Sequence, residues 1–97
     1  MPDNELELID SHAHLDLLKQ PQAALERARA AGVVQLVTIG IDLETSQRAA
    51  GFAAVHGDVF YTVGLHPHDA EQAGEAMWAD MENLARQGAV AWGECGL

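Results

Sequence analysis

Apolar and polar positions form two kinds of block that alternate along the chain. Short runs with adjacent apolar residues predict four strands, at residues 6–10, 33–39, 59–64 and 89–93. Apolar stripes at helical spacing fall between them and predict three helices, within residues 21–31, 43–56 and 71–87. The second run is apolar nearly throughout, which predicts a strand that is buried on both faces.

Local signals mark where the predicted helices begin and end. Pro21 suits the first position of a helix, and Asp42 suits the N-cap position of the next. Glycines stand where each helix should end, at Gly32, Gly57 and Gly88. The connections between helices and strands are therefore short.

A strand–helix rhythm with short connections predicts an α/β fold with parallel strands and crossover helices. About four such βα units make up the N-terminal half of a (β/α)8 TIM barrel. We therefore expect residues 1–97 to be a partial domain, truncated at its C-terminus. A half-barrel leaves its first and fourth strands as open edges, so self-association of two half-barrels is the alternative.

Composition narrows the function classes. Hydrophobic residues make up 48% of the chain and charged residues 21%, which is typical of a folded globular protein. Five Lys+Arg against 15 Asp+Glu give a net charge of −10, which disfavours a nucleic-acid-binding module. The charge permits an enzyme that reaches phosphate through metal cations.

The same composition bears on the compartment. The single cysteine, Cys95, cannot form an internal disulfide, and the polar start does not match a secretory signal. No apolar stretch approaches the roughly 20 residues of a membrane span. These features predict a cytoplasmic protein with no membrane association.

The segment with the clearest chemistry is Leu-Ile-Asp-Ser-His-Ala-His-Leu-Asp, at residues 8–16. Residues two apart on a strand point the same way, so His12 and His14 should project together from the carboxyl end of the first strand. That end is the active-site face of a parallel barrel. Two imidazoles at this spacing can share one divalent ion, and Asp10 could orient one of them. The alternative interpretation is a polar turn.

A second motif, Gly-Leu-His-Pro-His at residues 64–68, follows the third strand. His66 lies nearer the strand and is the better candidate for contacting a metal-bound phosphate. We interpret His68 as a helix cap or a solvent-facing residue.

A third motif places Glu94 at the end of the fourth strand. A carboxylate there could bridge two cations, as two-metal hydrolases require. The alternative is a surface glutamate, although Gly93 and Gly96 would allow close backbone approach to a ligand. We interpret Cys95 as a small buried hydrophobic residue.

Taken together, in this order and at these separations, the three motifs resemble the TatD family of metal-dependent nucleases, which are amidohydrolase-like TIM-barrel hydrolases. The resemblance implies hydrolysis that depends on two divalent ions (Mg, Mn or Zn) and a DNA substrate, at its ends or in single strands. It implies that His12 and His14 hold one metal and that Glu94 bridges to a second. It also implies that His66 lies near the scissile phosphate.

The family pattern continues beyond what these 97 residues contain. It includes an aspartate directly after Gly-Leu, two further histidine ligands, and a late aspartate that is both ligand and candidate base. We therefore expect the 97-residue chain to be inactive by itself and the full-length protein to be the enzyme.

Two alternatives stay open. One is another metal-dependent amidohydrolase or phosphoesterase that acts on a small molecule, which the acidic charge favours. The other is a non-catalytic half-barrel that self-associates through its open strand edges.

Overall fold

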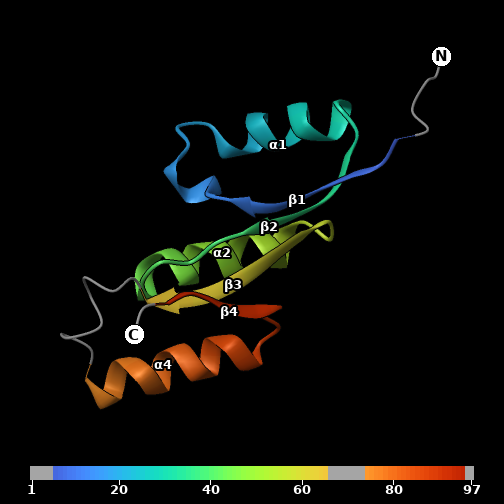
Figure 1. Ribbon diagram of the computed structural model, residues 1–97. Coiled ribbons are helices and arrows are strands. Elements are labelled where there is room, and N and C mark those ends of the chain that lie inside the picture. Colours follow the sequence, from blue (N-terminus) through green and yellow to red (C-terminus); the bar gives the residue numbers. More distant parts are fainter. Residues whose placement is uncertain (1–5, 66–73, 96–97) are drawn as a thin grey trace.

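One parallel sheet forms the framework of the protein. The computed structural model describes residues 6–65 and 74–95, the last two as backbone only. The sheet has four strands in chain order (Figure 1): β1 (Leu8–Ala13), β2 (Val33–Thr38), β3 (Val59–Leu65) and β4 (Ala91–Cys95). The described helices are α1 (Pro21–Ala30), α2 (Leu43–Val55) and α4 (Glu75–Arg86), and a 3-10 turn, η1 (Leu15–Leu17), follows β1.

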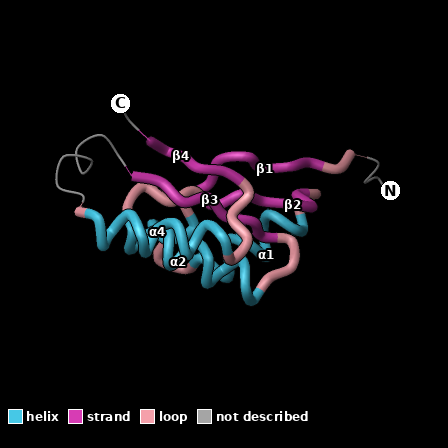
Figure 2. Tube along the Cα trace, turned by 90° about the horizontal axis from the view of Figure 1, so that it is seen from below, coloured by secondary structure: helices cyan, strands magenta, loops and turns pink. Residues whose placement is uncertain are grey.

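The helices lie in a single layer. Figure 2 shows α1, α2 and α4 against the same side of the sheet, as crossovers of one hand require. The opposite side bears none of the described helices. Every neighbouring pair of strands is parallel. This arrangement confirms the α/β class and the half of a TIM barrel predicted from the sequence.

Two apolar clusters fill the space between sheet and helices. The larger joins α2, β3 and α4 through the buried residues Ala49, Tyr61, Val63, Leu65, Met81 and Leu84. The smaller lies under α1 and η1 and contains Leu15, Leu25, Leu36 and Val59. In the larger cluster the Tyr61 hydroxyl donates to the carbonyl oxygen of Leu84 at 2.6 Å. Burial raises the pKa of Tyr61, so the phenol stays protonated.

Local signals place the helix ends as expected. Asp42 is the N-cap of α2: its Oδ1 accepts the Thr45 amide at 2.7 Å, and its own amide donates to the Thr45 hydroxyl at 3.0 Å. Gly32 and Gly88 follow α1 and α4 with φ of +103° and +134°, a conformation that suits glycine. Among the described residues, each helix is too short or too polar to serve as a membrane span.

The two edge strands lie further along the chain than predicted. β1 was expected to end at Asp10 but runs to Ala13, which pairs with Thr38 of β2. β4 was expected at residues 89–93 but spans Ala91–Cys95. In both cases pairing with the neighbouring strand continues through polar residues, which a hydrophobic pattern does not register.

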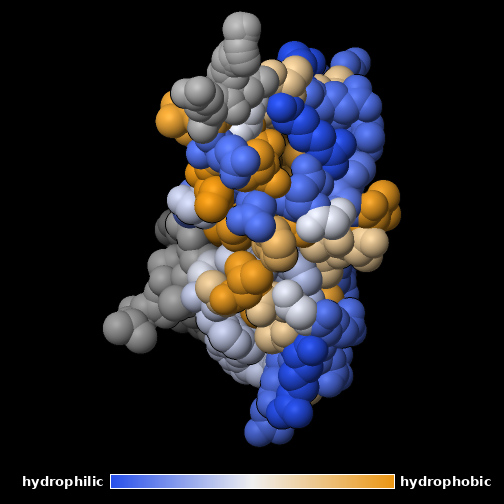
Figure 3. Space-filling view, turned by 90° about the vertical axis from the view of Figure 1, so that its right-hand side faces the viewer, coloured by the Kyte–Doolittle hydropathy of each residue, from blue (hydrophilic) through white to orange (hydrophobic). Residues whose placement is uncertain are grey.

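The prediction that β2 is buried on both faces is wrong for its first half. Val34 is 41% exposed and Gln35 is also exposed, whereas Leu36 and Thr38 are buried. Val33, in the same half, is half-buried and packs against the smaller cluster. Apolar surface also appears as separate patches among hydrophilic ones on the side shown in Figure 3.

A cluster of polar side chains connects α1 to the loop between α2 and β3 through hydrogen bonds and an ion pair. The Arg29 guanidinium contacts both carboxylate oxygens of Asp58 at 2.7 Å, and its Nη2 donates to His56 Nδ1 at 3.1 Å. The hydrogen bond from Arg29 lowers the pKa of Asp58. These groups stand near the amino end of β3, away from the predicted metal ligands.

Candidate metal centre

The two histidines of the first motif lie side by side. His12 is on β1, and His14 is the residue before η1. The residues between and after them, Ala13 and Leu15, pack into the smaller apolar cluster on the helix side. Side chains alternate along an extended chain, so His12 and His14 point toward the face without described helices. Their ring centroids are 5.1 Å apart, with the ring planes inclined by 72°.

An extra residue in β1 shapes the backbone at this motif. Asp10 pairs with Leu36 and Ala13 pairs with Thr38, so β1 advances three residues while β2 advances two. Such a β-bulge re-aims the side chains beside it. Within it, the His12 amide donates to Asp10 Oδ1 at 3.1 Å. That Asp10 orients an imidazole stays a prediction.

Buried Thr38 holds the turn that follows the histidines. Its Oγ1 accepts the Leu15 amide at 3.2 Å, and its side chain is completely shielded from solvent. On the other side of His14, the Ile39 amide donates to the carbonyl oxygen of Ala13 at 2.8 Å. β2 therefore fixes the chain both before and after His14.

A similar bulge occurs in β4, the strand that contains Glu94. Val63 pairs with Trp92 and Leu65 pairs with Cys95, so β4 advances three residues while β3 advances two. The Thr62 hydroxyl donates to the carbonyl oxygen of Gly93 at 2.6 Å, within the irregular stretch. The backbone of Glu94 thus lies in a bulge that a buried threonine of the neighbouring strand contacts.

The described residues include only part of the predicted metal site. His66 and His68 lie outside them, and for Glu94 only the backbone is described. Among the side chains that the structure describes, no group of three or more His, Cys, Asp or Glu is arranged to hold an ion. Two adjacent imidazoles on one face nevertheless fit a divalent ion as a partial donor set.

Sequence reasoning missed the two threonines and the bulges beside His12 and Glu94. A signal for the threonines was present, because Thr38-Ile39-Gly40 and Thr62-Val63-Gly64 share a Thr-x-Gly pattern where the two central strands end. A small polar residue inside such apolar runs stays buried only if its hydroxyl finds a partner.

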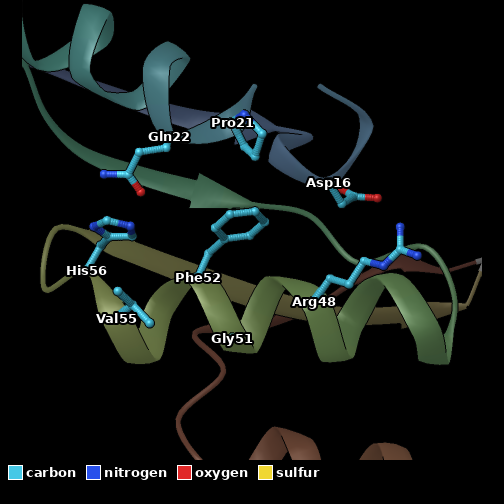
Figure 4. Close-up of a pocket in the computed structure, with 8 residues that line it drawn as sticks. All are labelled: Asp16, Pro21, Gln22, Arg48, Gly51, Phe52, Val55 and His56. Atoms are coloured by element: carbon cyan, nitrogen blue, oxygen red, sulfur yellow. The ribbon is translucent and has the colours of Figure 1, made fainter. Parts of the chain in front are cut away.

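A separate hollow of about 390 Å³ lies in the helix layer between α1 and α2. Pro21 and Phe52 face each other across it, with Asp16 and Arg48 at one end (Figure 4). One buried carboxylate oxygen of Asp16 has no hydrogen-bond partner among the described residues. This hollow is on the helix side of the sheet, whereas His12 and His14 point to the other side.

Comparison with known proteins identifies the family. The model of the family described as TatD related DNase matches residues 9–97, which is nearly the whole chain. The chain belongs to this family. Among TatD relatives, the 3′-5′ ssDNA/RNA exonuclease TatD of Cronobacter turicensis is 43% identical over 74 residues, covering 75% of this chain and 28% of the relative.

Two further TatD relatives align with nearly all of the chain. The uncharacterized metal-dependent hydrolase TatD of Mycobacterium tuberculosis is 36% identical over 96 residues, covering 93% of this chain and 36% of its own length. The uncharacterized metal-dependent hydrolase YabD of Bacillus subtilis is 34% identical over 94 residues, covering 93% of this chain and 37% of the relative. The chain thus spans about a third of the length of these relatives.

Proposed function

We propose that the full-length protein carrying this chain is a divalent-metal-dependent hydrolase that cleaves phosphodiester bonds of DNA. The observation that supports this most is the pairing of His12 and His14 on one face of the sheet, in a chain of the TatD family. One relative is named as an exonuclease of single-stranded DNA and RNA, and two are named as metal-dependent hydrolases. DNA ends or single strands are therefore the proposed substrates.

Each candidate residue has a proposed role. His12 and His14 bind one ion, and Glu94 bridges it to a second, with Mg, Mn or Zn as the candidates. His66 contacts the phosphate next to the scissile bond. Ions at such a site lower the pKa of bound water and offset negative charge on phosphate. The net charge of −10 makes that compensation necessary, because the chain by itself repels a polyanion.

Residues 1–97 are proposed to be part of a larger barrel domain. Three candidate ligands on half a barrel cannot enclose two ions, so these residues alone are expected to lack turnover. A discrete dimer that binds metal would instead support the alternative of a half-barrel completed by self-association. Gel filtration with light scattering distinguishes the two.

A nuclease assay tests the assignment. The full-length protein is incubated with end-labelled single-stranded and duplex DNA in Mg²⁺ or Mn²⁺, with and without a chelator. Glu94→Gln should remove activity, because the amide keeps the size of the side chain but loses the charge that binds cations. Glu82→Gln is the matched control, since the exposed Glu82 of α4 forms an ion pair with Arg86 at 2.6 Å and is not a candidate ligand. Full activity of Glu94→Gln would exclude Glu94 from the mechanism.

The acidic net charge favours one alternative function, in which the metal-dependent hydrolase acts on a small molecule. The same preparation should then hydrolyse small phosphate esters or amides while leaving both DNA substrates intact.

A further inference from the structure

We propose that Thr62 is a positioning residue of the metal centre, which fixes the backbone of β4 where Glu94 stands. The proposal rests on the proposed function, in which Glu94 is a metal ligand. It begins from the hydroxyl of Thr62, a side chain only 4% exposed. That hydroxyl donates to the carbonyl oxygen of Gly93 at 2.6 Å and accepts the amide of Gly40 at 3.2 Å.

The directions of these two hydrogen bonds are fixed by chemistry. An amide N–H can only donate, so the Gly40 amide occupies a lone pair of the hydroxyl and the hydroxyl proton goes to the Gly93 carbonyl. A chain of hydrogen bonds in a shielded site strengthens each of its members. One side chain on β3 therefore connects the end of β2 to the bulge in β4.

Gly40, which donates the first of these two hydrogen bonds, is itself fixed by close packing. A side-chain carbon at Gly40 would lie 2.8 Å from the carbonyl oxygen of Thr62 and 2.9 Å from Ser46 Cα, and it would also collide with Ser46 Oγ. Ser46 is fully buried in α2, and its Oγ accepts the Gly64 amide at 3.3 Å. Gly40 thus rests against α2 and β3, which gives Thr62 a rigid reference point.

The hydrogen bond from Thr62 to Gly93 matters because it lies in the bulge of β4. β4 gains one residue relative to β3 between Trp92 and Cys95, so the regular ladder does not determine the backbone at Gly93 and Glu94. The Thr62 hydroxyl supplies a contact at that point. Thr38 makes a comparable contact just after β1, where its Oγ1 accepts the amide of Leu15, the residue that follows His14 and begins η1. Each central strand thus carries a threonine that contacts the backbone one residue away from a proposed metal ligand.

The test removes the hydroxyl and measures metal affinity. Thr62→Val keeps the shape of the side chain, and Thr62→Ser keeps the hydroxyl. In the full-length protein, Mn²⁺ binding is measured by electron paramagnetic resonance and by calorimetry. Residues that orient metal ligands typically contribute about 10–100-fold to affinity, and we expect Thr62→Val to weaken Mn²⁺ binding by this factor. Thr62→Ser should restore most of it.

A matched control separates positioning from loss of stability. Thr45 is also a buried threonine, but its hydroxyl contacts Asp42 and the Ile41 amide at the start of α2 and not the backbone carbonyl of Gly93. Thr45→Val should lower the midpoint of unfolding and leave Mn²⁺ affinity unchanged. Amide hydrogen exchange gives a readout without metal, because the Gly40 amide should exchange faster in Thr62→Val than in the wild type.

The outcomes separate this inference from the proposed function. If Glu94→Gln binds Mn²⁺ as well as the wild type does, Glu94 is not a ligand and both proposals fail. If Glu94→Gln loses affinity while Thr62→Val keeps it, the proposed function stands and the role of Thr62 is refuted. Equal losses of affinity in Thr62→Val and Thr45→Val would also refute it, because lowered stability alone would then account for the effect.

Discussion

Replacing Gly40 by alanine tests how tightly the end of β2 packs beneath the candidate metal centre. The new methyl group would lie 2.8 Å from the Thr62 carbonyl oxygen and 2.9 Å from Ser46 Cα, where ordinary contacts are 3.4–4 Å. Both atoms belong to the backbone, so relief requires one segment to move by roughly half an ångström. Overpacking typically costs about 1–3 kcal/mol, and a backbone collision belongs at the upper end. We therefore expect Gly40→Ala to lower the free energy of unfolding by about 2–3 kcal/mol.

Gly51 provides the matched control. It lies inside α2, is exposed, and has nothing within 4 Å of the position where a side-chain carbon would stand. The same substitution there should stabilise the protein by about 0.5–1 kcal/mol, because alanine favours the helix and restricts the unfolded chain. The two variants are thus predicted to change stability in opposite directions.

Urea unfolding of the full-length protein, followed by circular dichroism, measures both changes. The Gly40 amide also donates to Thr62 Oγ1, so Gly40→Ala should weaken Mn²⁺ binding, whereas Gly51→Ala should not. A Gly40→Ala protein as stable as the wild type would refute the packing described at the end of β2. A destabilised Gly51→Ala protein would show that the steric reasoning does not discriminate between the two sites.

Three further predictions concern the core, the acid range and the metal. Met81 is completely buried, so Met81→Ala should cost about 2–5 kcal/mol in urea unfolding, and a cost below 1 kcal/mol would contradict the described core. The hydrogen bond from Arg29 lowers the pKa of Asp58, so this carboxylate contributes stability above its unfolded pKa and loses it as pH falls through the folded pKa. Asp58→Asn should therefore flatten the acid limb of a stability–pH profile, and an unchanged limb would exclude this origin. A metal at one hundred times its dissociation constant should stabilise the wild type by about 2.7 kcal/mol. His12→Ala should lose most of this metal-dependent stabilisation, measured as the rise in melting temperature on adding metal. An equal rise in the variant and the wild type would remove His12 from the ligand set.

The fold could be predicted from the sequence because it depends on local periodicity. Apolar runs and helical stripes, with Asp42 and Gly32 at helix ends, determine which elements form and in what order. The pairing of His12 with His14 also followed from strand alternation alone. These features need only the residues within one element or next to it.

The bulges could not be predicted, because they depend on the register between strands that are distant in sequence. β1 pairs with β2 through residues more than twenty positions apart, and β3 pairs with β4 at a similar separation. The roles of Thr38 and Thr62 follow from that register, since the Thr38 hydroxyl contacts the backbone of the turn after β1 and the Thr62 hydroxyl contacts the backbone of β4. The exposure of Val34 likewise depends on which elements cover β2 rather than on the strand itself.

The central claim is that His12, His14 and Glu94 bind divalent cations. Crystals of the full-length protein soaked with Zn²⁺ test it most directly. Anomalous diffraction should place an ion at about 2.0–2.1 Å from a ring nitrogen of both His12 and His14, with a Glu94 oxygen at a similar distance. An ion bound elsewhere, with both imidazoles uncoordinated and the Glu94 carboxylate turned away from them, would contradict the assignment.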